Sequence, residues 1–434
     1  MNYDISYLLE LEQELIALRR DLHKHPESGW TEFYTTARIV DELEALGLSV
    51  QYGPSIHVRE KMFGFPKAER LHECFARAAK DSSRPDIVRA LEGGFTGCAA
   101  LIKGALPGSK LAFRFDIDAN DLTETEDETH LPCRLGFRSG YAGCMHACGH
   151  DAHAAIGVGL AKLLVRERAR LRGSVLLLFQ PGEEGLRGAA SMTASGLLSD
   201  CDYLFSAHVG LFPDKELGTV VASAHGFLAS TKFDVAYTGK AVHAAAAPEK
   251  GRNALAAAAT AALHMLAIPP HHEGITRINV GTLHAGSGRN VIPAHAELAV
   301  ETRGESTQLD EYMHQTARRI CLSAGEMYGC DCEIKLMGSA GTADCDEALV
   351  SRIIPLLAKV DGVTDVLPDV NFGAGEDVTT MMREVQSHGG QATEMVLCMP
   401  LKAAHHNEHF DIDERVILLG VKVFASIALA LTDY

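Results

Sequence analysis

The chain has 434 residues, enough for two domains that each bury a core of their own. Apolar residues make up 47% and charged residues 22%, and the formal net charge of −17 excludes a nucleic-acid binder, which needs basic patches. No run of about 18 apolar residues that could span a membrane occurs. The first stretch has acids among its apolar residues, so we expect no signal or transit peptide. The eleven scattered cysteines favour a reducing cytoplasm over a disulfide framework.

The first part of the chain is predicted to be helical. Apolar residues recur at helical spacing over 8–18, and a second helical run covers 35–46. The segment 51–94 is polar and irregular, with only short helical patterns. We expect it to be an insertion or a cap on the substrate side.

Four short apolar runs then predict strands that are buried on both faces. Each run has about five residues and is separated from the next by helix-length segments, as in parallel strands joined by crossover helices. The runs are Lys110–Phe115, Val175–Phe179, Tyr203–Ala207 and Met395–Met399. The predicted fold is therefore mixed α/β, with a largely parallel sheet flanked by helices.

Between the third and fourth runs, the pattern changes to that of strands exposed on one side. Segments 230–237, 277–283 and 296–302 alternate apolar and polar residues, whereas 253–266 and 308–326 have helical spacing. This composition predicts a small α+β domain inserted into the larger one. We place the inserted domain at 228–339, and the larger domain at 1–227 and 340–434.

Polar side chains follow each of the four predicted parallel strands. Sites in such sheets lie just beyond the carboxyl ends of the strands. The residues that follow the four runs are, in order, Asp116 and Asp118, the loop Gln180–Gly185, His208, and the pair His405 and His406. Four strand ends that each supply carboxylates or imidazoles predict a metal site at this edge.

The segment His146–His153 combines a thiol, three imidazoles and a carboxylate within eight residues. Cysteine and histidine are the usual ligands of zinc and related metals, and Gly149 permits a backbone that turns Cys148 and His150 toward one ion. The alternative is a helix start capped by Asp151, with incidental histidines. A structural zinc site is disfavoured, because no second cysteine pair stands at finger or ribbon spacing.

The pair Glu183-Glu184 is the second strong signal. Adjacent side chains in a tight loop point in different directions, so one can ligate a metal while the other takes a proton from water. The alternative is two solvated glutamates on a surface loop.

Together these motifs resemble a known family. MHACGHDAH, QPGEEG, SAHVG, GKAVHAAAAPEKGRNAL and GSGRNVIP follow one another as in the di-metal amidohydrolases that include hippurate and auxin-conjugate hydrolases. The resemblance covers most of the chain. The stretches RDLHKHPESGW, EGGFTG and HHNEHFDIDE are most similar to the p-aminobenzoyl-glutamate hydrolases within that family.

The resemblance implies a site for two divalent ions, manganese or zinc. Cys148 corresponds to a thiolate that bridges both ions. His150 and His208 correspond to the remaining ligands of one ion, and Glu184 and His406 to those of the other. His406 is chosen over His405 because it stands four residues before Phe410, as the family's ligand does.

The resemblance also assigns catalytic and substrate-binding roles. Glu183 corresponds to the general base, and Asp116 to a carboxylate that orients His150. In the inserted lid or dimerisation domain, His243 corresponds to a histidine that reaches a partner's site and stabilises the oxyanion. Asn290 and Arg303 correspond to residues that hold the substrate carboxylate.

Some assignments have alternatives or depart from the family pattern. Arg303 could instead be a surface residue paired with Glu301 or Glu297, and Arg289 is an extra cation of undecided role. Gly182 stands where alanine is more typical, which loosens the loop. Arg114 stands where the wider superfamily has a metal-ligating histidine, and His150 replaces that ligand.

We therefore expect a metallo-amidohydrolase that cleaves a small N-acyl amino acid, p-aminobenzoyl-glutamate above others. The resemblance implies a homodimer or a hetero-oligomer with a related B subunit. Alternatives are a broader N-acyl-amino-acid or hippurate hydrolase, and a non-catalytic partner subunit of a related hydrolase.

Overall fold

A computed structural model describes residues 4–212 and 214–431, which form two compact units. Unit 1 comprises the chain up to His225, Ala343–Phe372, and the chain from Asp377 onward. Unit 2 comprises Gly226–Thr342 and Gly373–Glu376. The second piece of unit 2 lies in a stretch that the sequence analysis assigned to the larger domain.

Unit 1 is built on an eight-stranded sheet in the order β1-β2-β4-β3-β5-β14-β6-β12. The four neighbouring strands β4, β3, β5 and β14 run parallel, whereas β2 and β6 are antiparallel to their neighbours β4 and β14. The strands are β1 (Val50–Tyr52), β2 (Cys98–Lys103), β3 (Leu106–Asp116), β4 (Arg172–Gln180), β5 (Tyr203–Val209), β6 (Thr219–Val221), β12 (Asp365–Leu367) and β14 (Gln391–Leu397). A separate pair is formed by β7 (Ala224–His225) and β13 (Val370–Asn371).

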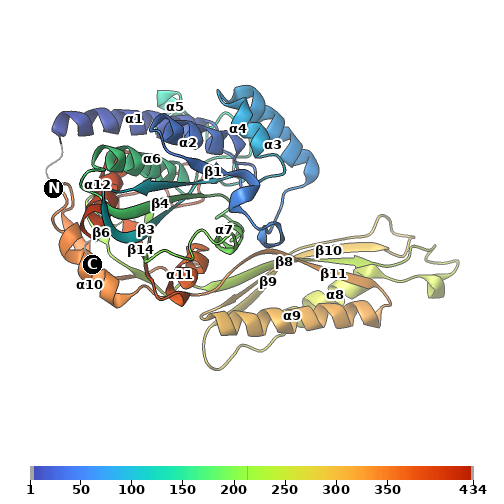
Figure 1. The fold of residues 1–434 in the computed structure, drawn as a ribbon. Helices are drawn as coiled ribbons and strands as arrows, with labels where there is room; N and C mark the ends of the chain where they lie inside the picture. Colours follow the sequence, from blue (N-terminus) through green and yellow to red (C-terminus); the bar gives the residue numbers. More distant parts are fainter. Residues whose placement is uncertain (1–3, 213, 432–434) are drawn as a thin grey trace. The chain divides into compact units, whose positions relative to one another are not determined.

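Helices cover both faces of this sheet (Figure 1). Phe113 and Phe115 of β3 pack against Phe424 on one face, with ring centroids 5.2 and 5.6 Å away, while Leu176 and Leu178 of β4 belong to the apolar cluster on the other face. The helices of unit 1 are α1 (Ile5–Lys24), α2 (Phe33–Ala45), α3 (Ala68–Asp81), α4 (Pro85–Ala90), α5 (Leu131–Leu135), α6 (His150–Arg166), α7 (Ala189–Ala194), α10 (Glu347–Leu357), α11 (Val378–Ser387) and α12 (Arg415–Ala430). Burial on both faces explains the unbroken apolar runs in the sequence.

The segment 51–94 adds an edge strand and two helices to unit 1. Strand β1 pairs with β2 at the edge of the sheet, two short 3-10 turns follow at Gly53–Ile56 and Arg59–Lys61, and α3 and α4 pack on α2. The indole of Trp30 is fully buried, stacks on Phe65 at 5.2 Å, and donates its N–H to the carbonyl of Phe63. The segment is therefore fastened to the N-terminal helices of unit 1.

Unit 2 has a four-stranded antiparallel sheet in the order β11-β8-β10-β9. Its elements are β8 (Ala229–Thr238), β9 (Thr276–Ala285), β10 (His295–Gly304), β11 (Asp331–Ala340), α8 (Ala254–Leu266), α9 (Thr307–Met327) and a 3-10 turn at Pro248–Lys250. Phe233, Val235 and Tyr237 of β8 are buried in the core shared with α8 and α9, whereas Asp234 on the opposite face is exposed. This alternation matches a sheet with one covered face.

The predicted fold class is confirmed, with corrections to single elements. The last parallel strand ends at Leu397, and the apolar residues Cys398 and Met399 are buried beyond it, because an apolar run reports burial and not strand pairing. The remaining strands of the described chain, β1, β2, β6, β7, β11, β12 and β13, were not predicted. Among the residues described, no helix combines the length and apolar character needed to cross a membrane.

Candidate metal centre

The five predicted metal ligands come from four chain segments of unit 1 and fall into two groups that share one thiol. Cys148, His150 and His208 form one group, and Cys148, Glu184 and His406 form the other. Within each group the candidate ligand atoms all lie within 4.8 Å of one another. This is the division of ligands that the family resemblance implies.

The start of α6 presents the first group. Gly149 is the N-cap residue of α6 with φ of +90°, and a side chain there would meet Val209 at 2.5 Å, so glycine is required. The thiol of Cys148 lies 3.4 Å from Nε2 of His208, which stands near the end of β5. Burial raises the pKa of this thiol.

The two histidines of the first group have their ring orientation fixed by main-chain carbonyls. Nδ1 of His150 donates to the carbonyl oxygen of Asp118, and Nδ1 of His208 donates to that of Val209, each at 2.9 Å. Each ring therefore keeps an Nε2 lone pair, the arrangement that metal-bound imidazoles use. Nε2 of His150 is buried and has no hydrogen-bond partner in the described part of the chain. A divalent cation fits this unfilled acceptor and the thiolate, imidazole and carboxylate donors around it.

The second group centres on the carboxylate of Glu184. Nε2 of His406 lies 3.0 Å from its Oε1, and the amide of Asn120 donates to the same oxygen at 2.6 Å. Burial raises the pKa of Glu184, but the hydrogen bond from His406 and the charge of His150 outweigh it and lower that pKa to about 2. His406 has φ of +61°, a conformation that non-glycine residues adopt rarely and that concentrates at functional sites.

His405 is directed elsewhere. Its Nε2 donates to the carbonyl oxygen of Val209 at 3.1 Å, and burial lowers its pKa to about 4. The structure thus brings His406, and not His405, to the carboxylate of Glu184.

Glu183 is 8% exposed and lies beside both groups. A carboxylate oxygen of Glu183, one of Glu184 and a ring nitrogen of His150 all lie within 4.8 Å of one another. A carboxylate at this place can exchange a proton with a small molecule held between the two ligand groups.

Asp116 has a different partner from the one predicted. The prediction that Asp116 orients His150 is corrected: Asp116 Oδ2 is 3.8 Å from Nε2 of His150, too far for a hydrogen bond, and its Oδ1 accepts from Nδ1 of His153. Nε2 of His153 in turn accepts from the N–H of Val209 at 3.0 Å, so both ring nitrogens of His153 are engaged.

Arg114, which replaces the histidine of the wider superfamily, is buried and held on several sides. It donates to Oδ2 of Asp116 at 2.7 Å, to Oε1 of Gln180 at 2.9 Å and to Oδ1 of Asp377 at 3.0 Å. Its guanidinium therefore joins the ends of β3 and β4 to the start of α11.

Asp151 and His146 are buried next to the ligand segment without joining either group. Asp151 accepts hydrogen bonds from Nε of Arg19 at 2.7 Å and from Nδ1 of His23 at 2.8 Å, and their charges hold its pKa well below the usual range despite its burial. Burial lowers the pKa of His146 to about 3. Asp151 therefore ties α1 to the start of α6 next to the ligand segment.

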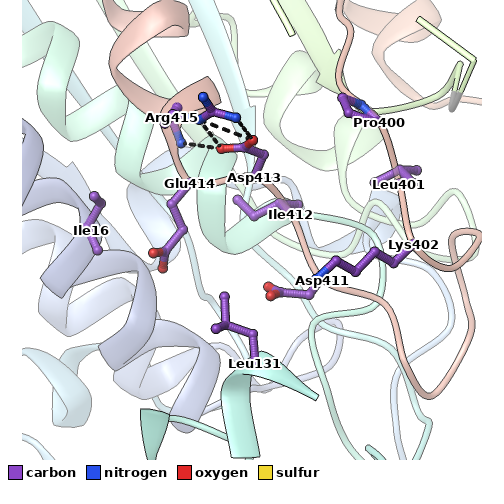
Figure 2. A pocket seen from close by; sticks show the side chains of 10 residues that line it. All are labelled: Ile16, Leu131, Pro400, Leu401, Lys402, Asp411, Ile412, Asp413, Glu414 and Arg415. Atoms are coloured by element: carbon purple, nitrogen blue, oxygen red, sulfur yellow. Dashed lines mark hydrogen bonds and ion pairs between the residues drawn. The ribbon is translucent and has the colours of Figure 1, made fainter. Parts of the chain in front are cut away.

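The pocket shown in Figure 2 is separate from the two ligand groups. It has a volume of about 470 Å³ and is lined mainly by 400–402 and 411–415. Its carboxylates are already paired: Arg415 donates to Asp413 at 2.9 Å, and Arg19 lies 2.8 Å from Asp411 and 3.4 Å from Glu414. None of the predicted site residues lines it.

The remaining predicted residues belong to unit 2. His243 is exposed, and its Nδ1 accepts from the N–H of Ala245 at 3.1 Å, which leaves the proton on Nε2. Asn290 lies beside it, because its carbonyl accepts from the N–H of Ala244 at 3.0 Å. Arg303 stands near the far end of β10 and forms an ion pair with Glu301, with Nε 3.0 Å from Oε2. The structure therefore brings His243 and Asn290 together and places Arg303 apart from them.

Asn120 was not predicted to lie near the ligands, and Asp118 was predicted only as a carboxylate at the end of a strand. Asn120 donates to Glu184 and also accepts from the N–H of Ala147 at 3.0 Å, so it ties the two ligand segments together. Asp118 holds His150 through its carbonyl oxygen. The available signal was their position, since both follow β3 at the edge where ligands gather.

Comparison with known proteins places these residues in a family context. The model of the family described as Peptidase family M20/M25/M40 matches residues 112–430. Indole-3-acetyl-aspartic acid hydrolase of Enterobacter agglomerans is 44% identical over 425 residues, covering 98% of this chain and 97% of that protein. A p-aminobenzoyl-glutamate hydrolase subunit of Escherichia coli K12 is also 44% identical over 425 residues, with the same coverage.

A solved structure is similar along the whole chain. The aminobenzoyl-glutamate utilization protein from Klebsiella pneumoniae has 38% sequence identity and a TM-score of 0.84, covering 98% of this chain and 97% of that one. The similarity includes both units and every segment that carries a predicted ligand.

Proposed function

The chain belongs to peptidase family M20/M25/M40, and on that premise we propose that it hydrolyses the amide bond between an aromatic acyl group and an acidic amino acid, with p-aminobenzoyl-glutamate as the leading substrate. Membership confirms the family predicted from the motifs, and with it a metallo-amidohydrolase. The observation that carries the proposal is the pair of ligand groups sharing Cys148, with Glu183 beside them.

Two divalent ions, manganese or zinc, are proposed as the cofactors. When bound, they lower the pKa of a water molecule and polarise the amide carbonyl. Cys148, His150 and His208 would hold one ion, and Cys148, Glu184 and His406 would hold the other. This assignment is supported by the unfilled Nε2 of His150 and by the mixed sulfur, nitrogen and oxygen donors.

Glu183 is proposed as the general base and acid. Its carboxylate takes a proton from the attacking water, whose oxygen forms a bond to the amide carbon. The same group then delivers that proton to the leaving nitrogen as the C–N bond breaks, so the amine departs neutral. His243, with its proton on Nε2, is proposed to donate to the oxyanion.

The substrate carboxylate is proposed to be held by residues of two copies. Arg303 lies eight residues beyond His295 on β10, roughly 26 Å along the strand, whereas Asn290 precedes His295. One carboxylate cannot touch Asn290 and Arg303 of the same chain over that distance. A homodimer, or a complex with a related B subunit, would bring these residues to one site. The Escherichia coli relative is named as one subunit of a hydrolase, and that name supports an oligomer.

An arylacetyl-aspartate is the second candidate substrate. It is favoured by the indole-3-acetyl-aspartic acid hydrolase, which is as similar in sequence as the p-aminobenzoyl-glutamate hydrolase. Both substrates join an aromatic acyl group to an amino acid with a second carboxylate.

The eleven cysteines are all unpaired, which supports a reducing compartment such as the cytoplasm.

Rates on three amides test this proposal. The full chain, expressed alone and loaded with Mn²⁺ or Zn²⁺, is assayed on p-aminobenzoyl-glutamate, indole-3-acetyl-aspartate and hippurate, with elemental analysis of the same sample. We expect the highest kcat/KM on p-aminobenzoyl-glutamate. Equal rates on hippurate would indicate the broader hydrolase, and a metal-loaded protein inactive on all three would point to a missing partner protein.

A further inference from the structure

Asp118 is a buried carboxylate that the proposed mechanism does not use. We propose that it is a positioning residue whose side chain holds the Glu183–Glu184 loop against the ligand groups, an inference that rests on the proposed function of that loop. Asp118 is 1% exposed and lies two residues past the end of β3.

The contacts of Asp118 join three segments of the site. Its Oδ1 accepts from the N–H of Glu183 and its Oδ2 from the N–H of Glu184, each at 3.0 Å. Its carbonyl oxygen accepts from Nδ1 of His150 at 2.9 Å. Its Oδ1 also lies 3.4 Å from that same Nδ1. The side chain therefore makes its shortest bonds to the loop after β4, while the shortest bond to the start of α6 comes from the main chain.

Fixing two consecutive amides fixes the directions of both glutamates. With both amides fixed, Glu184 faces His406, while a carboxylate oxygen of Glu183 lies within 4.8 Å of one of Glu184 and of a ring nitrogen of His150, where it can transfer a proton. A rotation of the loop would move both together. The preceding amide, that of Gly182, is held by Oε1 of the buried Glu32 at 2.8 Å, which leaves the loop little freedom.

Only a carboxylate satisfies this geometry. Two N–H donors face the side chain, and a carboxylate offers two acceptor oxygens with a charge that strengthens both bonds. Asparagine has nearly the same shape, but its NH₂ group would face one of the two N–H donors. The change D118N therefore breaks one bond and sets donor against donor, while it keeps the main-chain bond to His150.

This division predicts a selective defect. In D118N the group Cys148, Glu184 and His406 should lose affinity for metal, while the group Cys148, His150 and His208 should keep it. Loss of an indirect partner of a metal ligand costs on the order of 10- to 100-fold in affinity. A merely structural role would weaken both groups alike.

Glu27 provides a matched control within unit 1. It is 1% exposed, and its two oxygens accept from the consecutive N–H groups of Tyr34 and Thr35 at 3.0 and 2.9 Å. Those amides open α2 and belong to neither ligand group. The change E27Q therefore removes the same kind of bond at a place where it holds only a helix.

The test is a titration of the metal-free full chain with Co²⁺, read by its visible and thiolate charge-transfer bands, for wild type, D118N and E27Q. In D118N we expect the first ion to bind within about threefold of wild type and the second about 10- to 100-fold more weakly. E27Q should bind both ions as wild type does, even where its melting temperature falls as far. Wild-type affinity for both ions in D118N, or an equal loss for both, would overturn the proposal.

The test depends neither on the folding of one variant nor on a measurement of activity. If D118N does not fold, D118E keeps the charge and lengthens the side chain, and the same selective loss is expected. The titration needs no substrate. A wild-type protein that binds two Co²⁺ ions but cleaves none of the three amides would point to a missing partner protein, while the metal titration would still decide the role of Asp118.

Discussion

In unit 1, four predicted ligands gather around a fifth, the buried thiol of Cys148, whereas in unit 2 the predicted substrate residues lie at the surface and toward both ends of one strand. The unit 1 ligands are also held by further bonds, such as those from Asn120 and to the carbonyl of Asp118. Arg303 pairs with Glu301, a half-buried residue of the same strand. The candidate metal centre lies within one unit of one chain, whereas the proposed substrate site would draw on a second chain.

The largest effect is expected at Glu183. The change E183Q removes the proton acceptor and should lower kcat on p-aminobenzoyl-glutamate by about 10²- to 10⁴-fold, with both ions retained. The neighbouring change E184Q should instead lose one ion. Elemental analysis beside single-turnover kinetics separates the two variants. Loss of metal in E183Q, or full activity, would contradict the assignment of the base.

His243 tests whether unit 2 serves another chain. The change H243A should lower kcat by about 10²- to 10³-fold, the usual cost of an oxyanion donor. Mixing H243A with E183Q should restore about a quarter of the wild-type rate, because half of randomly assorted dimers are mixed and each of those has one intact site.

The control for this mixture is H272A, which changes a histidine of unit 2 whose side chain is 86% exposed. It should be fully active alone. If the mixture of H243A and E183Q stays inactive after the subunits have demonstrably exchanged, His243 acts within its own chain or not at all.

His57, a buried histidine of unit 1, should make the stability of the protein depend on pH. Burial lowers its pKa to about 4, although its Nε2 donates to the carbonyl of Thr96. Because the folded pKa lies below the value of about 6.5 in an unfolded chain, its contribution is complete above pH 6.5 and is lost as the pH falls toward 4. Its size is up to about 3 kcal/mol.

Urea unfolding of wild type and H57Q between pH 7 and pH 4 measures this term. Wild type should lose more stability than H57Q over this range, and the exposed control H272Q should follow the wild-type curve. Parallel curves for wild type and H57Q would show that His57 does not titrate in this way.

The sequence indicated Glu184 and His208 because they stand near the ends of predicted strands. Cys148 and His150 were indicated by the composition of their segment, and His406 was chosen over its neighbour from the family resemblance. It could not predict which partner Asp116 takes, because His150 and His153 are three residues apart on α6 and their rings stack at 5.4 Å. Small shifts of the helix decide which of the two rings meets the carboxylate. The roles of Asp118 and Asn120 escaped for a related reason, since they depend on main-chain groups of distant loops.

The smallest effect on turnover is expected at Arg303, and it bears directly on the divided substrate site. If the guanidinium of Arg303 holds a carboxylate of a substrate bound in another chain's site, R303A should raise KM by about 10- to 100-fold. The value of kcat should change little, since the charge-assisted pair is lost in the ground state and in the transition state alike. Stability should change little, because the Arg303 side chain is 41% exposed and solvent screens its pair with Glu301. Arg277 is the matched control, since it is the cross-strand neighbour of Arg303 on β9 and is exposed. An equal rise of KM in R277A would mean that general positive charge, and not a specific contact, attracts the anionic substrate, whereas no rise in either variant would leave Arg303 as a surface partner of Glu301.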